Sequence, residues 1–166
     1  MSGNSYNQSA LNTMKQFLDD HDFFKKKALR SFPSISSPGM DGQPHGGAHD
    51  PDMPFVNHAE LVFQYTMREK VCSNVKEISK TDEPYGDLLM FRYIDKLHRD
   101  ATIIKLNRRY GDDPDIGSDW PADMANSTFT ERLNRALSLA LDICPDQSVH
   151  DGTYSQKMAQ IRHKLA

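Results

Sequence analysis

The sequence predicts an all-α fold: a small helical bundle that ends in a helix-turn-helix with a long inserted loop. Three observations lead to this prediction. Apolar residues recur at steps of three and four along several segments, capping signals precede some of these segments, and stretches rich in proline, glycine or aspartate separate them. Such patterns are typical of helices that bury one face against their neighbours.

Composition limits the class of protein. At 166 residues the chain is long enough for one domain of ordinary size with appendages, and a net charge of −3 excludes a wholly basic chromatin-type protein. Its two cysteines, Cys72 and Cys144, lie far apart on apolar helical faces, so we expect buried free thiols rather than a disulfide. The sequence contains neither a membrane span nor a signal-peptide core, so we expect a soluble intracellular protein that does not contact membranes.

Four parts are expected along the chain. Residues 1–30 form an N-terminal helical arm, and residues 31–54 form a linker in which proline and glycine preclude a helix. Residues 55–144 form a helical domain that contains the helix-turn-helix, and residues 145–166 form a polar tail with a short helix for self-association or docking. The basic cluster at residues 25–30 is expected to be a solvated helix end, with phosphate contact as the alternative.

A long helix is expected near residues 57–79. Asn57 and Glu60 have the spacing of a capping box, which marks the start of a helix. An apolar stripe with helical steps then runs along the segment, and we expect all of it to be core: Val56, Ala59, Phe63, Met67, Val71, Val75 and Ile78.

Two more helices are expected before a long loop. The acidic residues ahead of Pro84 predict a new helix start, and the segment 88–97 is apolar on nearly every side, so we expect neighbours around it. Asp100 is expected to cap a short helix at residues 101–106. Residues 108–126 then contain two prolines and a block of aspartates, a far longer connection than the three or four residues of a simple helix-turn-helix. We expect Trp120 to pin this loop to the core and its acidic residues to point away from DNA.

The last main helix is expected at residues 127–143. Ser127 or Thr128 is expected to cap it, and Thr128 with Glu131 has the spacing of a capping box. One face is apolar and the other is polar; the apolar face consists of Phe129, Leu133, Ala136, Leu137, Ala140 and Cys144. A polar-faced helix behind a short helix and a buried one indicates a helix-turn-helix that reads DNA.

Positive charge gathers next to this helix. Between Gly86 and Tyr110 there are six positive and three negative side chains, a local excess in an acidic chain. Each arginine is interpreted either as part of a solvated helix face or as a DNA contact. The residues that we expect to contact DNA are Lys105, Arg108, Arg109, Ser127, Thr128, Thr130, Glu131, Arg132 and Arg135.

These residues have different expected roles. Arg132 or Arg135 is expected to bind the two acceptors of guanine, and Glu131 is expected to accept a hydrogen bond from cytosine. Ser127 and the first backbone N–H groups of the helix are expected to meet a phosphate, while the basic residues at 105–109 hold the DNA backbone.

Motifs of catalysis and metal binding are weak. His45 and His49, followed by Asp50 and Asp52, resemble metal ligands only by residue type, because the glycine-rich stretch that carries them does not preorganise a site. The sequence contains no nucleophile elbow and no phosphate-cradling loop. We therefore expect no catalytic residue, no bound metal and no cofactor.

The order of three short motifs resembles the ArpU family of phage late-gene transcriptional regulators. These motifs are Arg92-Tyr93-Ile94, Ser127-Thr128-Phe129 and Ala136-Leu137, and the stretch SPGMDGQPHGG is similar to the proline- and glycine-rich segment of that family. The resemblance covers approximately residues 17–143. The inserted acidic loop departs from the tighter turn of the family.

This resemblance implies a fold and a function. The C-terminal part of the family is similar to region four of sigma factors, a helix-turn-helix fold. The implied function is control of phage packaging and lysis genes through double-stranded promoter or operator DNA, in the cytoplasm of the bacterial host. A homo-oligomer and a contact with host RNA polymerase are both compatible with that function.

Two other functions remain open from the sequence. One is a packaging accessory that grips phage DNA in the manner of a small terminase subunit, which predicts ring-forming oligomers. The other is an adaptor that binds host RNA polymerase through the acidic loop and the C-terminal tail, without DNA specificity of its own.

Overall fold

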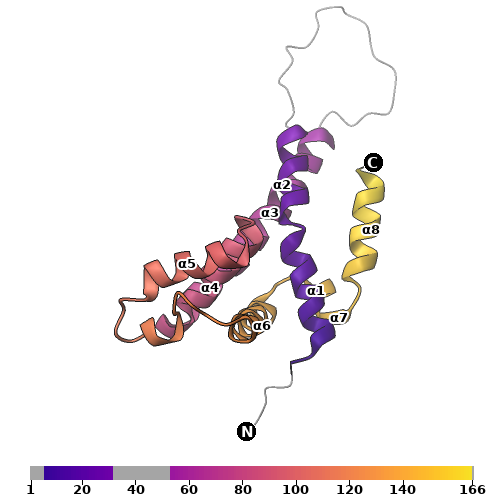
Figure 1. Ribbon diagram of the computed structural model, residues 1–166. Helices are drawn as coiled ribbons and strands as arrows, with labels where there is room; N and C mark the ends of the chain where they lie inside the picture. Colours follow the sequence, from indigo (N-terminus) through magenta and orange to yellow (C-terminus); the bar gives the residue numbers. More distant parts are fainter. Residues whose placement is uncertain (1–5, 32–52, 166) are drawn as a thin grey trace, which may run out of the picture.

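The computed structural model describes residues 6–31 and 53–165, and every regular element in these ranges is helical (Figure 1). The α-helices are α1 (Gln8–Asp19), α2 (His21–Arg30), α3 (Met53–Ile78), α4 (Glu83–Leu89), α5 (Arg99–Tyr110), α6 (Asn126–Ile143), α7 (Gln147–Asp151) and α8 (Tyr154–Lys164). Two 3-10 turns, η1 (Lys80–Asp82) and η3 (Gly117–Asp119), and one π-helical turn, η2 (Met90–Ile94), complete the set. The all-α prediction is confirmed. Residues 32–52 of the expected linker, His45 and His49 among them, lie outside the described residues, and α3 already begins at Met53, before the expected end of the linker at residue 54.

The N-terminal helices belong to the core. In Figure 1, α1 and α2 follow one another almost end to end, and they join at Asp20. Met14, Phe17 and Leu18 are fully buried, with α1 packed on α6 and α2 packed on α3. The expectation of a separate N-terminal arm is therefore wrong, because these side chains fill space between the central helices.

The long helix α3 buries a different face from the one expected. Its buried positions are Leu61, Gln64, Arg68, Val71, Cys72 and Val75. Of the apolar stripe predicted as core, Val56, Phe63 and Ile78 are exposed. The helix also begins at Met53, so Asn57 does not cap it, and Glu60 instead accepts a hydrogen bond from the Gln64 side chain one turn later.

Close contact between α3 and α4 depends on Gly86. A Cβ atom at this position would lie 2.7 Å from the backbone nitrogen of Lys76 and 2.9 Å from the carbonyl oxygen of Cys72. Residues 84–89 are all buried. Of the helix expected at 88–97, however, only the first two residues belong to α4; the chain continues through η2, and Asp95 and Lys96 are exposed. Pro84 occupies the first turn of α4, which confirms the predicted helix start.

The amphipathic pattern of α6 is confirmed. Phe129, Ala136, Leu137 and Ala140 are buried, and α6 packs on α1, α3 and α4. By contrast, α5 packs on α4 and on η2. The two helices expected to form the helix-turn-helix therefore both lie against α4, and residues 111–125 connect them through η3.

The C-terminal segment is also part of the core. Tyr154 is 1% exposed and Met158 is 2% exposed, and Figure 1 shows α8 running beside α1 and α2. The segment was expected to be an appended polar tail. Its hydropathy is low because the buried residues are separated by polar ones, of which Ser155 and Gln156 are exposed.

The described residues contain neither a helix suited to cross a membrane nor a cluster of metal ligands. Within 6–31 and 53–165, no helix has the length and apolar character that a membrane crossing requires. In the same ranges, no three histidine, cysteine or acidic side chains are grouped so that they could share a metal ion.

Candidate functional site

The three basic residues expected to hold the DNA backbone lie together on α5. Lys105, Arg108 and Arg109 surround a shallow hollow next to Phe91. The Lys105 ammonium lies 4.9 Å from the centre of the Phe91 ring, within the range of a cation–π contact. Arg108 is exposed and has no hydrogen-bond or ion-pair partner in the described part of the chain. Lys105 and Arg108 are therefore available to an anion.

Arg109 is exposed, but an ion pair ties it to α4. Its guanidinium donates to Asp87 at 2.7 Å, and Asp87 is almost fully buried. The same carboxylate pairs with Lys76 at 2.9 Å and accepts a hydrogen bond from the Tyr110 hydroxyl. The hydrogen bond to Asp87 raises the pKa of Arg109. Because its removal would leave a buried carboxylate with less compensation, Arg109 has a structural role.

The first turn of α6 presents polar side chains to solvent. Ser127, Thr130 and Glu131 are exposed, while Thr128 is half-buried. The helix begins at Asn126, and its N-cap, Ala125, provides no side-chain hydrogen bond. The expected capping by Ser127 or Thr128 is therefore wrong, because the helix starts before these residues. The backbone N–H groups of the first turn have no side-chain cap and are free to bind an anion.

Arg132 and Arg135 both lie against Tyr85 of α4. Arg132 donates to the Tyr85 hydroxyl at 3.4 Å and lies 3.7 Å from Asp119, and Arg135 lies 3.6 Å from Asp82. These distances are long for charge-assisted hydrogen bonds. The buried Nε of Arg132 also has no hydrogen-bond partner among the described residues. The two guanidinium groups are thus loosely held, and other acceptors can compete for them.

The acidic loop is fixed against the core next to these arginines. Trp120 is 2% exposed, its ring meets the Tyr85 ring edge-on at 5.2 Å, and its carbonyl accepts a hydrogen bond from Asn107. This confirms that Trp120 pins the loop. Asp115 pairs with Lys80 at 2.9 Å. We expected the acidic residues to point away from DNA, whereas Asp119 lies beside Arg132, one of the residues expected to contact DNA, because Trp120 holds the loop against α4.

The predicted site is divided into two groups by α4. Tyr85 contacts the arginines of α6, and Asp87 contacts Arg109 of α5. Residues two positions apart on a helix point in nearly opposite directions. In the described part of the chain, no hydrogen bond, ion pair or ring contact joins the basic residues of α5 to those of α6.

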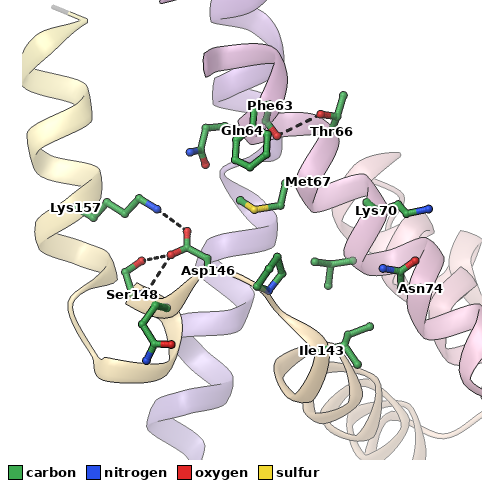
Figure 2. A pocket seen from close by; sticks show the side chains of 13 residues that line it. Phe63, Gln64, Thr66, Met67, Lys70, Asn74, Ile143, Asp146, Ser148 and Lys157 are labelled. Atoms are coloured by element: carbon green, nitrogen blue, oxygen red, sulfur yellow. Dashed lines mark hydrogen bonds and ion pairs between the residues drawn. The ribbon is translucent and has the colours of Figure 1, made fainter. Parts of the chain in front are cut away.

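A groove that the sequence did not predict lies between α3 and the connection from α6 to α8 (Figure 2). It has a volume of about 950 Å³. Phe63 stands at one end, and Met67, Val71, Ile143 and Pro145 line it further along. We call it the α3 groove. The apolar stripe of α3 is the feature of the sequence that corresponds to this groove, but we interpreted the stripe as core.

The α3 groove has a charged wall on the side of α8. Lys157 donates to Asp146 at 2.7 Å, and Asp146 also accepts from the backbone nitrogen and the hydroxyl of Ser148 (Figure 2). Hydrogen bonds from Lys157 and Ser148 lower the pKa of Asp146, although burial of the carboxyl acts in the opposite direction and is the largest single effect. The opposite charges of Lys157 and Asp146 on this wall therefore already compensate each other.

Comparisons of the chain with protein-family models, with curated proteins and with solved structures find no match. The fold and the surfaces define the class: an all-α protein with a polar helix start, a separate basic hollow and an open apolar groove. Function is inferred from these features alone.

Proposed function

We propose that this chain is a sequence-specific DNA-binding transcriptional regulator, and that the start of α6 reads the major groove. The observation that carries the proposal is the first turn of α6, where uncapped backbone N–H groups lie next to the exposed side chains of Ser127, Thr130 and Glu131. A helix start of this kind binds a phosphate and brings short polar side chains to base edges.

The free cations of α5 support this proposal. Lys105 and Arg108 are exposed and lack carboxylate partners in the described chain. They can therefore bind a phosphate without breaking an ion pair within the protein. Arg132 and Arg135 act as additional contacts after they leave Asp119 and Asp82. Glu131 restricts the site, because a carboxylate accepts from cytosine and is repelled by a phosphate.

The biological role is proposed from the resemblance to the ArpU family. We propose that the DNA is a promoter or operator of phage late genes for packaging and lysis, and that the protein acts in the bacterial cytoplasm. The order of the three motifs supports this role: residues 92–94 fall in η2, and residues 127–129 and 136–137 fall in α6.

A selection of bound duplexes from a random library, followed by fluorescence anisotropy on the selected sequence, tests the proposal. We expect Lys105→Ala and Arg108→Ala each to reduce the salt dependence of binding by about one released counterion. Ser127→Ala and Glu131→Ala are expected to change which sequences are preferred. Arg99→Ala is the matched control, because Arg99 lies on the same helix and already pairs with Asp100 at 2.9 Å. Selection of no consensus sequence would overturn the proposal.

A second candidate function is an adaptor that binds host RNA polymerase. Asp82, Asp115 and Asp119 line a small hollow together with Arg135 and Trp120, and a basic protein partner could compete for these carboxylates with the arginines that lie 3.6–3.7 Å from Asp82 and Asp119. Binding to purified RNA polymerase without any DNA shift would favour the adaptor. The packaging alternative requires ring-shaped oligomers, which light scattering detects.

A further inference from the structure

The outer face of α3 carries large apolar side chains that the rest of the described chain leaves exposed. Val56 is 57% exposed and Phe63 is 56% exposed, although both belong to a stripe with the spacing of a core. Exposed apolar residues grouped in this way mark interaction surfaces. The surface continues into the α3 groove, where Met67 is half-buried.

Two opposite charges flank this apolar surface along α3. Glu60 is exposed, and among the described residues its partner is the neutral side-chain amide of Gln64 at 2.8 Å. Lys70 is exposed, lines the groove and has no ion-pair partner in the described ranges. Figure 2 shows Lys70 on α3 and Lys157 on the opposite wall, where Lys157 is bound to Asp146. Between positions 60 and 70 of this face, the charged side chains without an ion-pair partner in the described chain are therefore one acid and one base, at opposite ends.

The order of these side chains is self-complementary. Glu60, Phe63, Met67 and Lys70 follow one another at steps of three, four and three, so they share one face of α3. If a second α3 helix lies antiparallel on this face, position 60 meets position 70 and position 63 meets position 67. Each acid then faces a base, and each aromatic ring faces a thioether, which is a favourable pair.

We propose that a second copy of this chain docks antiparallel on this face of α3 and forms a two-fold symmetric dimer. Glu60 of each protomer pairs with the partner subunit's Lys70, and Phe63 enters the partner's groove beside the partner subunit's Met67. This inference does not depend on the proposed DNA binding, because it uses none of the residues of α5 or of the first turn of α6.

Charge complementarity favours a second copy over other occupants. An acidic helix would pair with Lys70 but would bring like charge to Glu60, and a basic helix would have the opposite fault. A second copy of α3 neutralises both ends with the same contact. It also supplies the aromatic side chain that the apolar groove accommodates.

Analytical ultracentrifugation of the full chain over a range of concentrations tests the apolar part of the contact. We expect the wild-type protein to dimerise reversibly and Phe63→Glu to raise the dimer dissociation constant by roughly a hundredfold, because a charge would be buried in the groove. The matched control is Leu29→Glu, since Leu29 on α2 is 71% exposed and lies outside the proposed surface. Circular dichroism confirms that each variant is folded.

Charge exchange tests the antiparallel arrangement. Glu60→Lys and Lys70→Glu are each expected to raise the dissociation constant at least roughly tenfold, because each variant faces itself with like charges. An equimolar mixture of the two variants is expected to form heterodimers of wild-type affinity, and the double exchange in one chain is expected to restore homodimers.

Each result decides the proposal. A wild-type monomer at all concentrations would overturn it and would leave the groove to a different chain. A dimer that is insensitive to Phe63→Glu, or single variants that are not rescued by mixing, would also overturn it. Anisotropy with DNA on the same variants keeps a failure of dimerisation distinct from a failure of DNA binding.

Discussion

The guanidinium of Arg68 donates a 2.7 Å hydrogen bond to the hydroxyl of Tyr154, which lies 86 positions further along the chain. The Tyr154 hydroxyl in turn donates to Asp20 at 2.8 Å. Arg68 is fully buried, donates to the carbonyl of Phe17 at 2.6 Å, and lies over the rings of Phe17 and Phe24. One buried cation thus joins α1, α2, α3 and α8.

Substitution of Arg68 is expected to destabilise the whole fold. Arg68→Met keeps much of the side-chain volume but leaves the Phe17 carbonyl and the Tyr154 hydroxyl without their donor. We expect a loss of about 3 kcal/mol in the free energy of unfolding, measured by urea denaturation. Arg30→Met, at an exposed arginine of α2, is the control and should change stability by less than about 0.5 kcal/mol. Equal effects of the two substitutions would contradict the role of Arg68.

Deletion of α8 is expected to abolish cooperative unfolding. A chain that ends at Gly152 loses Tyr154, which contacts the Phe17 ring edge-on at 5.7 Å, and loses Met158 from the core. The Arg68 guanidinium would then be open to water. Near-ultraviolet circular dichroism and urea titration measure the result. A truncated chain with a wild-type urea midpoint would show that the segment is an appendage after all.

Neutralisation of Asp119 is expected to strengthen DNA binding. Asp119→Asn removes the carboxylate that lies 3.7 Å from Arg132, so the arginine is released and repulsion of phosphate decreases. We expect affinity to rise by roughly three- to tenfold, with fluorescence anisotropy as the measurement. Asp112→Asn is the control, because Asp112 is an exposed acid of the same loop. The prediction fails if the two variants bind equally well.

Mild acid is expected to destabilise the protein through His21. Burial lowers the pKa of His21 below 6.5, although a 2.8 Å contact with Glu69 opposes the shift. The unfolded chain therefore takes up a proton more readily than the folded chain, and stability falls as the pH decreases through about 6.5. Urea midpoints at pH 7.5 and pH 5.5 measure the loss. His21→Gln removes this titration, so the urea midpoint of the variant should change less between pH 7.5 and pH 5.5. If the variant lost as much stability as the wild-type protein over this interval, His21 would be ruled out as the cause.

Both thiols are expected to be unreactive in the folded protein. Burial raises the pKa of Cys72 to about 12, and burial also raises the pKa of Cys144. Because the thiolate is the reactive form, a disulfide reagent at pH 8 should modify neither thiol until the chain unfolds. The denatured protein provides the reference of two reactive thiols. Rapid modification of the native protein would contradict the burial of these side chains.

The buried face of α6 and the position of Trp120 were predicted correctly from the sequence. The face of α6 that carries Phe129 and Leu137 is buried as expected, and Trp120 holds the loop as expected. On α6 the apolar face turns inward, as its 3.6-residue period predicts. The equally periodic stripe of α3 nevertheless leaves Val56 and Phe63 exposed, so periodicity alone does not decide burial.

The burial of the polar residues that the prediction missed has a common physical cause. Polar residues were interpreted as exposed, so the burial of Gln64 and Arg68 on α3 and the role of Tyr154 in a polar segment were missed. Their burial depends on partners that are distant in sequence, such as Phe17 and Asp20, which no local pattern reveals. In the predicted site, the contact of Arg132 with Asp119 likewise depends on how a loop folds back, which composition does not determine.

The joining of segments far apart in the sequence through Arg68 has a consequence for biosynthesis. Tyr154 leaves the ribosome 86 residues after Arg68, and until it does, the Arg68 guanidinium lacks the tyrosine hydroxyl and Phe17 lacks a neighbouring ring. The nascent chain therefore acquires its helices well before it can close its interior. We expect the incompletely packed chain to be prone to self-association during that interval.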